Sequence, residues 1–346
     1  MTTKVSNNLE IGNYRKNVLI NGNFDIWQRG VSSAITTYLA DRWKSGGSGT
    51  TKLTTRETFT LGQTDVPNNP KYYARTNISV AGVDAGNNAN IHQRIEGVGT
   101  LAGENITLSF WGKADSNKTI VAEFSQYFGS GGSPSAPNFN VANISVNLTS
   151  TWQKITLQIA VPDISGLTIG TDNNDYFRIF FWFDAGSSYD FRTNSLGHQT
   201  GTFDIAQVQV EKGSYATNFE MRSETEELSL CQRYFEKTYN TDVVPGTITS
   251  EGEIECRQDA VGSETMSGHN MLNGYFKVTK RGTPTMTGYN PVTGTAGQLR
   301  DKLADTNHTI DYFYQPSEGG FGGVFTVSSI NSNKKLALHW IADAEL

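Results

Sequence analysis

From residue 17 to about residue 220, the sequence is a succession of short segments in which apolar and polar residues alternate. Residues 106–110, 155–159 and 203–210 all follow this period of two, and clusters of Gly, Asn, Ser and Pro separate such segments. Successive side chains of a β-strand point to opposite faces, so the alternation is typical of strands with one buried face. Apolar residues at helical spacing are absent from this stretch. Strands repeated over some two hundred residues predict a sandwich or a barrel.

The composition excludes several classes of partner. Charged residues make up only 18% of the chain and the formal net charge is -6, so the clustered Lys and Arg that nucleic acid would require are missing. The N-terminus lacks the apolar core of a signal peptide, and no segment approaches the ~18 apolar residues of a membrane span. Cys231 and Cys256 have no paired spacing, which predicts neither a disulfide framework nor a zinc site. We expect a chain made in the cytosol, with no nucleic-acid partner and no membrane insertion.

The segment 176–184 breaks the half-polar pattern. Its core-facing residues would be Phe177, Ile179, Phe181 and Phe183. The opposite face would carry Tyr176, Arg178, Phe180 and Trp182. A row of aromatic rings with an arginine is typical of a buried or subunit contact, or of a platform on which sugar rings stack. Both interpretations stay open, and the glycan-binding candidates are Tyr176, Arg178 and Trp182.

At Ser223 the spacing of the apolar residues changes from that of a strand to that of a helix. Residues 223–226, Ser-Glu-Thr-Glu, form a capping box, which predicts a helix over 223–239. One apolar line runs through Leu228, Cys231, Phe235 and Thr238, and a second line contains Leu230 and Tyr234. Each of the two apolar faces of this helix is expected to pack against another surface. One surface would be the preceding sandwich, and the other would be the same helix of neighbouring copies around a symmetry axis.

Residues 247–346 return to strand patterns after a linker at 240–246. Strands are predicted at 274–279, 323–327 and 335–341, and a helical turn at 298–303. This part of the chain is predicted to be a second, smaller β domain.

Common catalytic motifs are absent. The sequence contains no phosphate-binding loop, no nucleophile elbow and no His-Glu-x-x-His helix, and its five histidines show no ligand spacing. Glycoside hydrolysis needs only two carboxylates, which remote positions can supply, so it stays an open alternative. The carboxylates near the aromatic segment are Asp172, Asp175, Asp184 and Asp190.

Several segments carry a resemblance to a known class of protein. Residues 21–30, Asn-Gly-Asn-Phe-Asp-Ile-Trp-Gln-Arg-Gly, and 40–43, Ala-Asp-Arg-Trp, resemble the opening of many bacteriophage tail-fibre proteins. The first domain is similar to their jelly roll and to the carbohydrate-binding modules of glycosidases, through 108–114, 151–154 and 205–211. The remaining segments that resemble the phage proteins are 213–219, 227–237, 276–285 and 342–346.

The resemblance implies an all-β fibre or spike protein that forms a homotrimer on a virion, as a tail or head fibre, after synthesis in the host bacterial cytoplasm. The implied regions are a lead-in at 1–16 that docks to other virion proteins, a jelly roll at 17–222, a trimer-axis helix at 223–241 and a C-terminal tip or cap at 242–346. The trimer interface would contain Leu228, Cys231 and Phe235. In the related modules an Asn-Gly-x-Phe-acid turn and paired acids on the last strand hold calcium. Asn21, Asn23 and Asp25 match that turn, but the paired acids fall on Ala206 and Gln207.

The function expected from the sequence is therefore adhesion to host cell-surface glycan without catalysis. Several weak sites on a trimer would make such binding effective. The alternatives are a depolymerase of surface polysaccharide and an accessory sugar-binding module of a bacterial or prophage-encoded enzyme.

Overall fold

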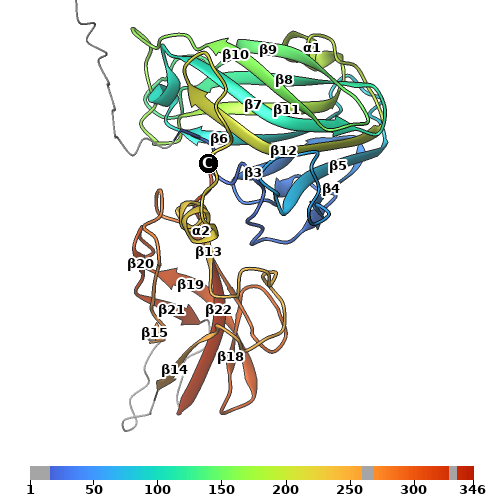
Figure 1. Ribbon diagram of the computed structural model, residues 1–346. Coiled ribbons are helices and arrows are strands. Elements are labelled where there is room, and N and C mark those ends of the chain that lie inside the picture. The colour runs from blue at the N-terminus through green and yellow to red at the C-terminus, as the bar shows by residue number, and fades with distance from the viewer. Residues whose placement is uncertain (1–15, 259–268, 271, 327–332) are drawn as a thin grey trace, which may run out of the picture.

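The computed structural model describes residues 16–258, 269–270, 272–326 and 333–346. Figure 1 shows a large two-layered β domain, a smaller β domain, and the helix α2 at the junction between them. The last residues of the chain also lie at this junction. In the part of the chain that the structure describes, no helix is long and apolar enough to cross a membrane.

Two six-stranded antiparallel sheets form the large domain. Sheet A contains, in order, β1 (Ser32–Ser33), β4 (Thr51–Thr58), β5 (Tyr72–Val80), β12 (Gly201–Lys212), β7 (Asn105–Ala114) and β10 (Gln153–Ala160). Sheet B contains β2 (Thr37–Tyr38), β3 (Trp43–Ser48), β6 (Asn88–Glu96), β11 (Tyr176–Ala185), β8 (Lys118–Tyr127) and β9 (Asn138–Leu148). The chain passes repeatedly from one sheet to the other, and the domain is the predicted jelly-roll β-sandwich. The alternating segments 106–110, 155–159 and 203–210 lie in β7, β10 and β12, as predicted.

The core of the sandwich lies between the two sheets. Phe110 of sheet A meets Phe181 of sheet B edge to face, with ring centroids 4.8 Å apart. Phe183 stacks on Phe203 at 5.0 Å, and all four rings are fully buried. The inward face of the segment 176–184 is therefore core, as its alternation predicted.

Short helical turns interrupt the strands where none was expected. They are η1 (Val98–Leu101), η2 (Ser187–Tyr189) and α1 (Asp190–Thr193). Each has at most four residues, too few to show an apolar period in the sequence.

The smaller domain is organised around β22 (Lys334–Asp343). The first half of β22 pairs with β14 (Ile254–Gln258) and β18 (Gln298–Asp301), and its second half pairs with β13 (Phe235–Lys237) and β17 (Thr285–Tyr289). The sheet continues from β18 through β19 (Thr306–Tyr314) and β21 (Gly323–Thr326) to β15 (His269–Asn270), while β16 (Gly274–Tyr275) pairs with β20 (Gly320–Phe321). The helical turn predicted at 298–303 is wrong, because β18 pairs with β19 and β22 there.

The junction helix is shorter than predicted. Ser223 caps α2 (Glu224–Gln232) as expected, with its Oγ accepting from the amide of Glu226 at 3.2 Å. The chain then leaves the helix, and residues 235–237 form β13 against β22. The predicted continuation to 239 is wrong because pairing with a strand about a hundred residues away overrides the local helical pattern.

A buried polar network joins the two domains. Arg42 forms an ion pair with Glu345 and stacks on the ring of Tyr234, whose centroid is 3.4 Å from the guanidinium carbon. The Nζ of Lys237 donates to the carbonyl of Gln28 at 2.6 Å. These groups are buried or nearly so, so the network fixes the C-terminal residues against the sandwich.

Candidate functional site

The predicted glycan platform on β11 is covered. Tyr176, Arg178 and Trp182 are 6%, 9% and 2% exposed, so they do not form an exposed row on which sugar rings could stack. The prediction of a stacking platform is wrong, and the alternative of a buried contact is correct for Trp182.

Residues 186–199 provide the cover over Trp182. This segment, which contains η2 and α1, packs Tyr189 and Leu196 onto Phe180 and Trp182. Trp182 donates its indole hydrogen to Glu123 at 2.6 Å, and Arg192 of α1 donates two hydrogen bonds to the same carboxylate at 2.8 and 2.9 Å. Burial raises the pKa of Glu123, while Arg192 and Trp182 oppose the shift. The cover is thus held by apolar packing and by a buried ion pair.

The predicted trimer interface is already occupied within one chain. Cys231 and Phe235 are each 1% exposed, and the guanidinium of Arg29 lies 3.7 Å from the ring centroid of Phe235. Leu228 is half-buried, while Glu224 and Ser229 are exposed. Cys231 and Phe235 therefore cannot line an axis between copies, and the helix presents a polar surface instead.

In the predicted calcium turn, the side chain of Asn21 is used by the fold. Asn21 is fully buried, and its side chain bonds the backbone of Ile26 and Asp41. Asn23 donates to Asp25 at 2.8 Å. Among the described residues no group of three or more His, Cys, Asp or Glu could hold a metal ion. Asn21 is thus a structural turn residue, because its side-chain oxygen already accepts from the amide of Ile26.

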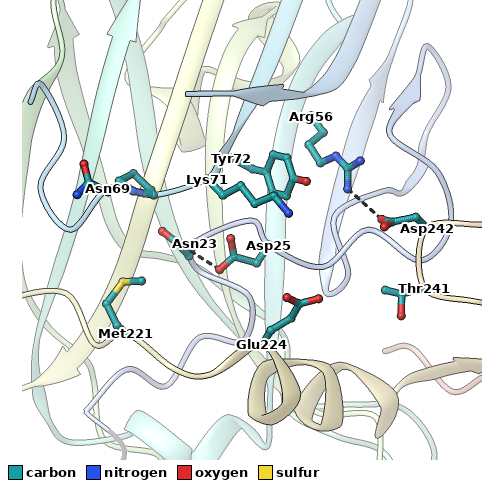
Figure 2. Close-up of a pocket in the computed structure, with 11 residues that line it drawn as sticks. Asn23, Asp25, Arg56, Asn69, Lys71, Tyr72, Met221, Glu224, Thr241 and Asp242 are labelled. Carbon is teal, nitrogen blue, oxygen red and sulfur yellow. Dashed lines mark hydrogen bonds and ion pairs between the residues drawn. The ribbon is translucent and has the colours of Figure 1, made fainter. Parts of the chain in front are cut away.

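Asn23 and Asp25 instead line a pocket of about 210 Å³ at the junction, where Glu224 and Lys71 also point inward (Figure 2). Burial raises the pKa of Asp25, and Glu224 adds to the shift while Asn23 and Lys71 oppose it.

Three of the four carboxylates considered for hydrolysis bond to neighbouring groups of the fold. Asp175 accepts from the amide of Val98 at 2.7 Å, and Asp172 accepts from Ser130 at 2.7 Å. Asp184 is fully buried and bonds His198 and the amide of Gln199. Asp190 begins α1. None of these four carboxylates lines the pocket beside Asp25.

A different surface offers a binding cavity. On the outer face of sheet A, a cavity of about 170 Å³ lies beside Trp111, and we name it the Trp111 cavity. Its lining consists of Pro67, Asn68, Ser109, Phe110, Trp111, Lys154, Gln207, Asn218 and Phe219. Trp111 is half-buried on β7, directly between Ala206 of β12 and Lys154 of β10. Two loops, 59–71 and 213–219, contribute the rest of the wall.

Gln207 gives this cavity a free hydrogen-bond acceptor. It sits at the bulge of β12 with φ of 47°, is 2% exposed, and donates to the carbonyl of Pro67 at 2.8 Å. Its Oε1 is buried and has no partner among the described residues. An unpaired buried acceptor is costly, so it is suited to take a hydroxyl of a ligand. Asn68 and Asn218 at the rim are exposed amides.

A second aromatic group packs on sheet A outside the lining of the Trp111 cavity. Trp152 contacts Phe59 and Tyr73, with both pairs of ring centroids 5.3 Å apart. The ammonium of Lys113 lies 5.1 Å above the Trp152 ring. The outer face of sheet A therefore combines half-exposed indole rings with amides and lysines.

The sequence pattern missed this site for a physical reason. Trp111 stands in the alternating segment of β7 as a polar-face residue, and that position alone was a usable signal. The sequence does not indicate a binding role for Gln207. The strand bulge that brings its side chain against residue 67 depends on contacts with a loop that is remote in the sequence.

The class that this architecture defines is a jelly-roll β-sandwich protein with an appended β domain. No protein-family model and no curated protein matches the chain. Among solved structures, it overlaps a family 4 carbohydrate-binding module with TM-score 0.33 and 21% identity, over 56% of this chain and 98% of that one. A putative sugar-binding protein from Bacteroides thetaiotaomicron overlaps with TM-score 0.34 and 14% identity, over 57% of this chain and 100% of that one.

A phage protein is among the overlapping structures as well. The enzymatically active domain of tailspike protein 4 from bacteriophage CBA120 gives TM-score 0.33 and 16% identity, over 57% of this chain and 21% of that one. The overlap thus covers about a fifth of the tailspike structure. At such identities and scores, these similarities assign no ligand, partner or activity to this chain.

Proposed function

We propose that this protein is a non-catalytic glycan-binding adhesin, and that the Trp111 cavity is its sugar site. The observation that carries the proposal is the unpartnered Oε1 of Gln207 at the wall of a cavity that Trp111 borders. Aromatic rings stack on the apolar faces of ring compounds, and a few placed polar groups then fix orientation. Lys154 and the two asparagines would supply donors for further hydroxyl groups.

The size of the cavity limits the ligand. Pockets that enclose a drug-sized ligand measure roughly 300–1,000 Å³, whereas this cavity measures about 170 Å³. It is therefore suited to one ring at the end of a glycan, with weak affinity per site. Weak sites become effective when several copies bind one surface.

The setting we propose is a fibre or spike of a bacteriophage particle. Its support is the resemblance of residues 21–30, 40–43 and 227–237 to phage fibres. A homotrimer belongs to the same proposal, with its contact outside Cys231 and Phe235 because both are buried in one chain. Light scattering on a sizing column tests this setting: a mass of three chains supports the fibre, and a monomer contradicts it and favours an accessory module.

A glycan array of bacterial surface polysaccharides tests the binding function. We expect the wild type to bind a defined set of glycans, and Trp111→Ala and Gln207→Leu to lose at least tenfold in affinity. Phe191→Ala is the matched control, because Phe191 is 59% exposed on α1 over the other sheet. Equal binding by Trp111→Ala and the wild type would remove the cavity as the site. Shortened polymer chains after incubation would contradict the absence of catalysis.

A further inference from the structure

The pocket of about 210 Å³ beside Asp25, which we name the junction pocket, is lined by more acidic than basic side chains. Its carboxylates belong to Asp25, Glu224 and Asp242, and its cations belong to Arg56 and Lys71. One negative charge is therefore left over. Figure 2 shows Glu224, at the start of α2, reaching toward Asp25 across the pocket.

The two cations are held by other groups. The guanidinium carbon of Arg56 lies 4.4 Å from the ring centroid of Tyr72, and the Nζ of Lys71 lies 4.8 Å from it. Arg56 also forms an ion pair with Asp242 at 3.4 Å. In the described part of the chain, neither cation forms an ion pair with Asp25 or Glu224. These two carboxylates are thus left for a ligand.

Asn23 adds a buried acceptor that the fold does not use. It is 6% exposed, and Figure 2 shows it projecting into the pocket beside Asp25. Its Nδ2 donates to the Oδ2 of Asp25 at 2.8 Å, which turns its Oδ1 away from that carboxylate. The Oδ1 is buried and has no partner among the described residues. A buried acceptor without a donor is costly, so a ligand that donates to it would be stabilised.

The two free carboxylates lie close to this acceptor. Burial raises the pKa of Asp25, and the negative charge of Glu224 raises it further, whereas Asn23 and Lys71 oppose the shift. Glu224 is exposed and accepts no hydrogen bond from the described residues. The pocket therefore offers three acceptors, two of which are negatively charged. A primary ammonium group carries one positive charge, three N–H donors and no acceptor, which matches this set.

We propose that the junction pocket binds an amino sugar through its primary ammonium group, which donates to the Oδ1 of Asn23 and to the carboxylates of Asp25 and Glu224. Hydrogen bonds between charged partners are the strong ones. Calcium, by contrast, takes roughly six to eight oxygen ligands, and among the described residues no group of three or more His, Cys, Asp or Glu could hold a metal ion.

The rest of the pocket fits a single sugar ring. Its volume of about 210 Å³ lies below the roughly 300–1,000 Å³ of pockets for drug-sized ligands. The amide of Asn69 and the hydroxyl of Thr241 can bond ring hydroxyl groups, and Met221 offers an apolar contact. The junction pocket shares no lining residue with the Trp111 cavity. This inference therefore goes beyond the function proposed for that cavity.

Calorimetric titrations at constant ionic strength, at a pH at which the sugar amine is protonated, test the proposal. The probes are D-glucosamine, N-acetyl-D-glucosamine as the uncharged match, ethanolamine as the ammonium without a ring, and calcium chloride. We expect glucosamine to bind at least tenfold more tightly than N-acetylglucosamine or ethanolamine. Equal binding of N-acetylglucosamine would overturn the ammonium site, and equal binding of ethanolamine would overturn its assignment to a sugar. Displacement of glucosamine by an equal concentration of calcium would assign the pocket to a metal ion.

Glu224→Gln is the decisive variant, because Glu224 is exposed and its replacement should leave the protein folded. We expect a loss of about threefold in glucosamine affinity, since solvent screens an exposed charge, and a loss of at least tenfold for Asp25→Asn. Glu226→Gln is the matched control: it removes the same charge from the same turn of α2 but does not line the pocket. Unchanged affinity in Glu224→Gln, or an equal loss in Glu226→Gln, would overturn the proposal.

The two proposed sites fail separately. Glucosamine binding should be unchanged in Trp111→Ala, because Trp111 does not line the junction pocket. Loss of glucosamine binding in that variant would place the ligand in the Trp111 cavity and overturn the site at the junction.

Discussion

The two outer faces of the sandwich both carry aromatic rings, but only one of them keeps rings available to a ligand. On sheet B, Trp182 is 2% exposed beneath α1, and its indole donates to the buried Glu123. On sheet A, Trp111 is half-buried beside a cavity and next to the exposed Lys154. The difference arises from the loops: residues 186–199 close over sheet B, whereas residues 59–71 and 213–219 border a hollow on sheet A.

The comparison shows that an aromatic row on a strand is not by itself a binding platform. A period of two assigns a side chain to a face of a sheet, but a remote segment decides whether that face meets water. The same rings can therefore stabilise the fold or bind a ligand. Substitutions of single rings on each sheet separate these two roles.

The largest effect is expected for Trp182→Ala. Removing a buried indole should lower the free energy of unfolding by about 3–5 kcal/mol, because a cavity forms under α1 and Glu123 loses a donor. Urea unfolding measures this change. A loss below about 1 kcal/mol would mean that residues 186–199 do not seal sheet B. Phe191→Ala on the same segment is the control, with an expected change within about 0.5 kcal/mol.

The second effect is a pH dependence where sheet B meets the C-terminal residues. Burial raises the pKa of Asp41, which lies two residues before the start of β3, from 3.8 to about 6, although Arg29 opposes the shift. The folded state therefore binds the proton of the Asp41 carboxyl group more tightly than the unfolded state does. The resulting stabilisation is full below about pH 4 and is lost as the pH rises through 6, a change of roughly 3 kcal/mol.

Asp41→Asn should remove this dependence. The measurement is the free energy of unfolding of both proteins from pH 4 to pH 7. We expect the value of the wild type, relative to that of the variant, to fall by roughly 3 kcal/mol over this range. A constant difference would contradict a raised pKa for Asp41. The variant also keeps an acceptor for Gln28, which limits other changes at the junction.

A smaller effect is expected for Phe59→Ala on sheet A. Phe59 is half-buried against Tyr73 and Trp152, so its loss should cost about 1–2 kcal/mol, less than a fully buried phenylalanine. Thermal unfolding measures it. A cost as large as that of Trp182→Ala would show that the aromatic group on sheet A is core rather than surface.

The smallest change in stability is expected for Trp111→Ala. Because the Trp111 ring is half-exposed beside a cavity, we expect a loss of about 1 kcal/mol or less in the free energy of unfolding, together with the loss of glycan binding. Chemical unfolding and the array must be measured on the same preparation. A stability loss above about 3 kcal/mol would assign Trp111 to the core and leave its binding role without support.

Much of the fold could be predicted from the sequence, because alternation in strands such as β7, β10 and β12 depends on local chemistry. The capping box at Ser223 also predicted where α2 begins. Its end could not be predicted, since residues 235–237 pair with β22 across the chain. Cys231 and Phe235 then became buried in the junction rather than at an axis between copies.

The candidate site was less accessible to sequence analysis. Tyr176 and Trp182 were correctly placed on one face, but nothing in their own segment reveals that 186–199 covers it. Gln207 depends on a strand bulge and a loop that bends over sheet A. The predicted lead-in at 1–16 falls almost wholly outside the described residues, and its docking role stays a prediction.

The most direct test of the account is an NMR titration of the tryptophan indole resonances with the best glycan from the array. The protein has six tryptophans, and their indole signals can be assigned by single substitutions. We predict that the Trp111 signal shifts most, that Trp152 shifts less, and that Trp182 stays unchanged beneath its cover. A shift of Trp182 with no change at Trp111 would contradict the assignment of the sugar site to sheet A.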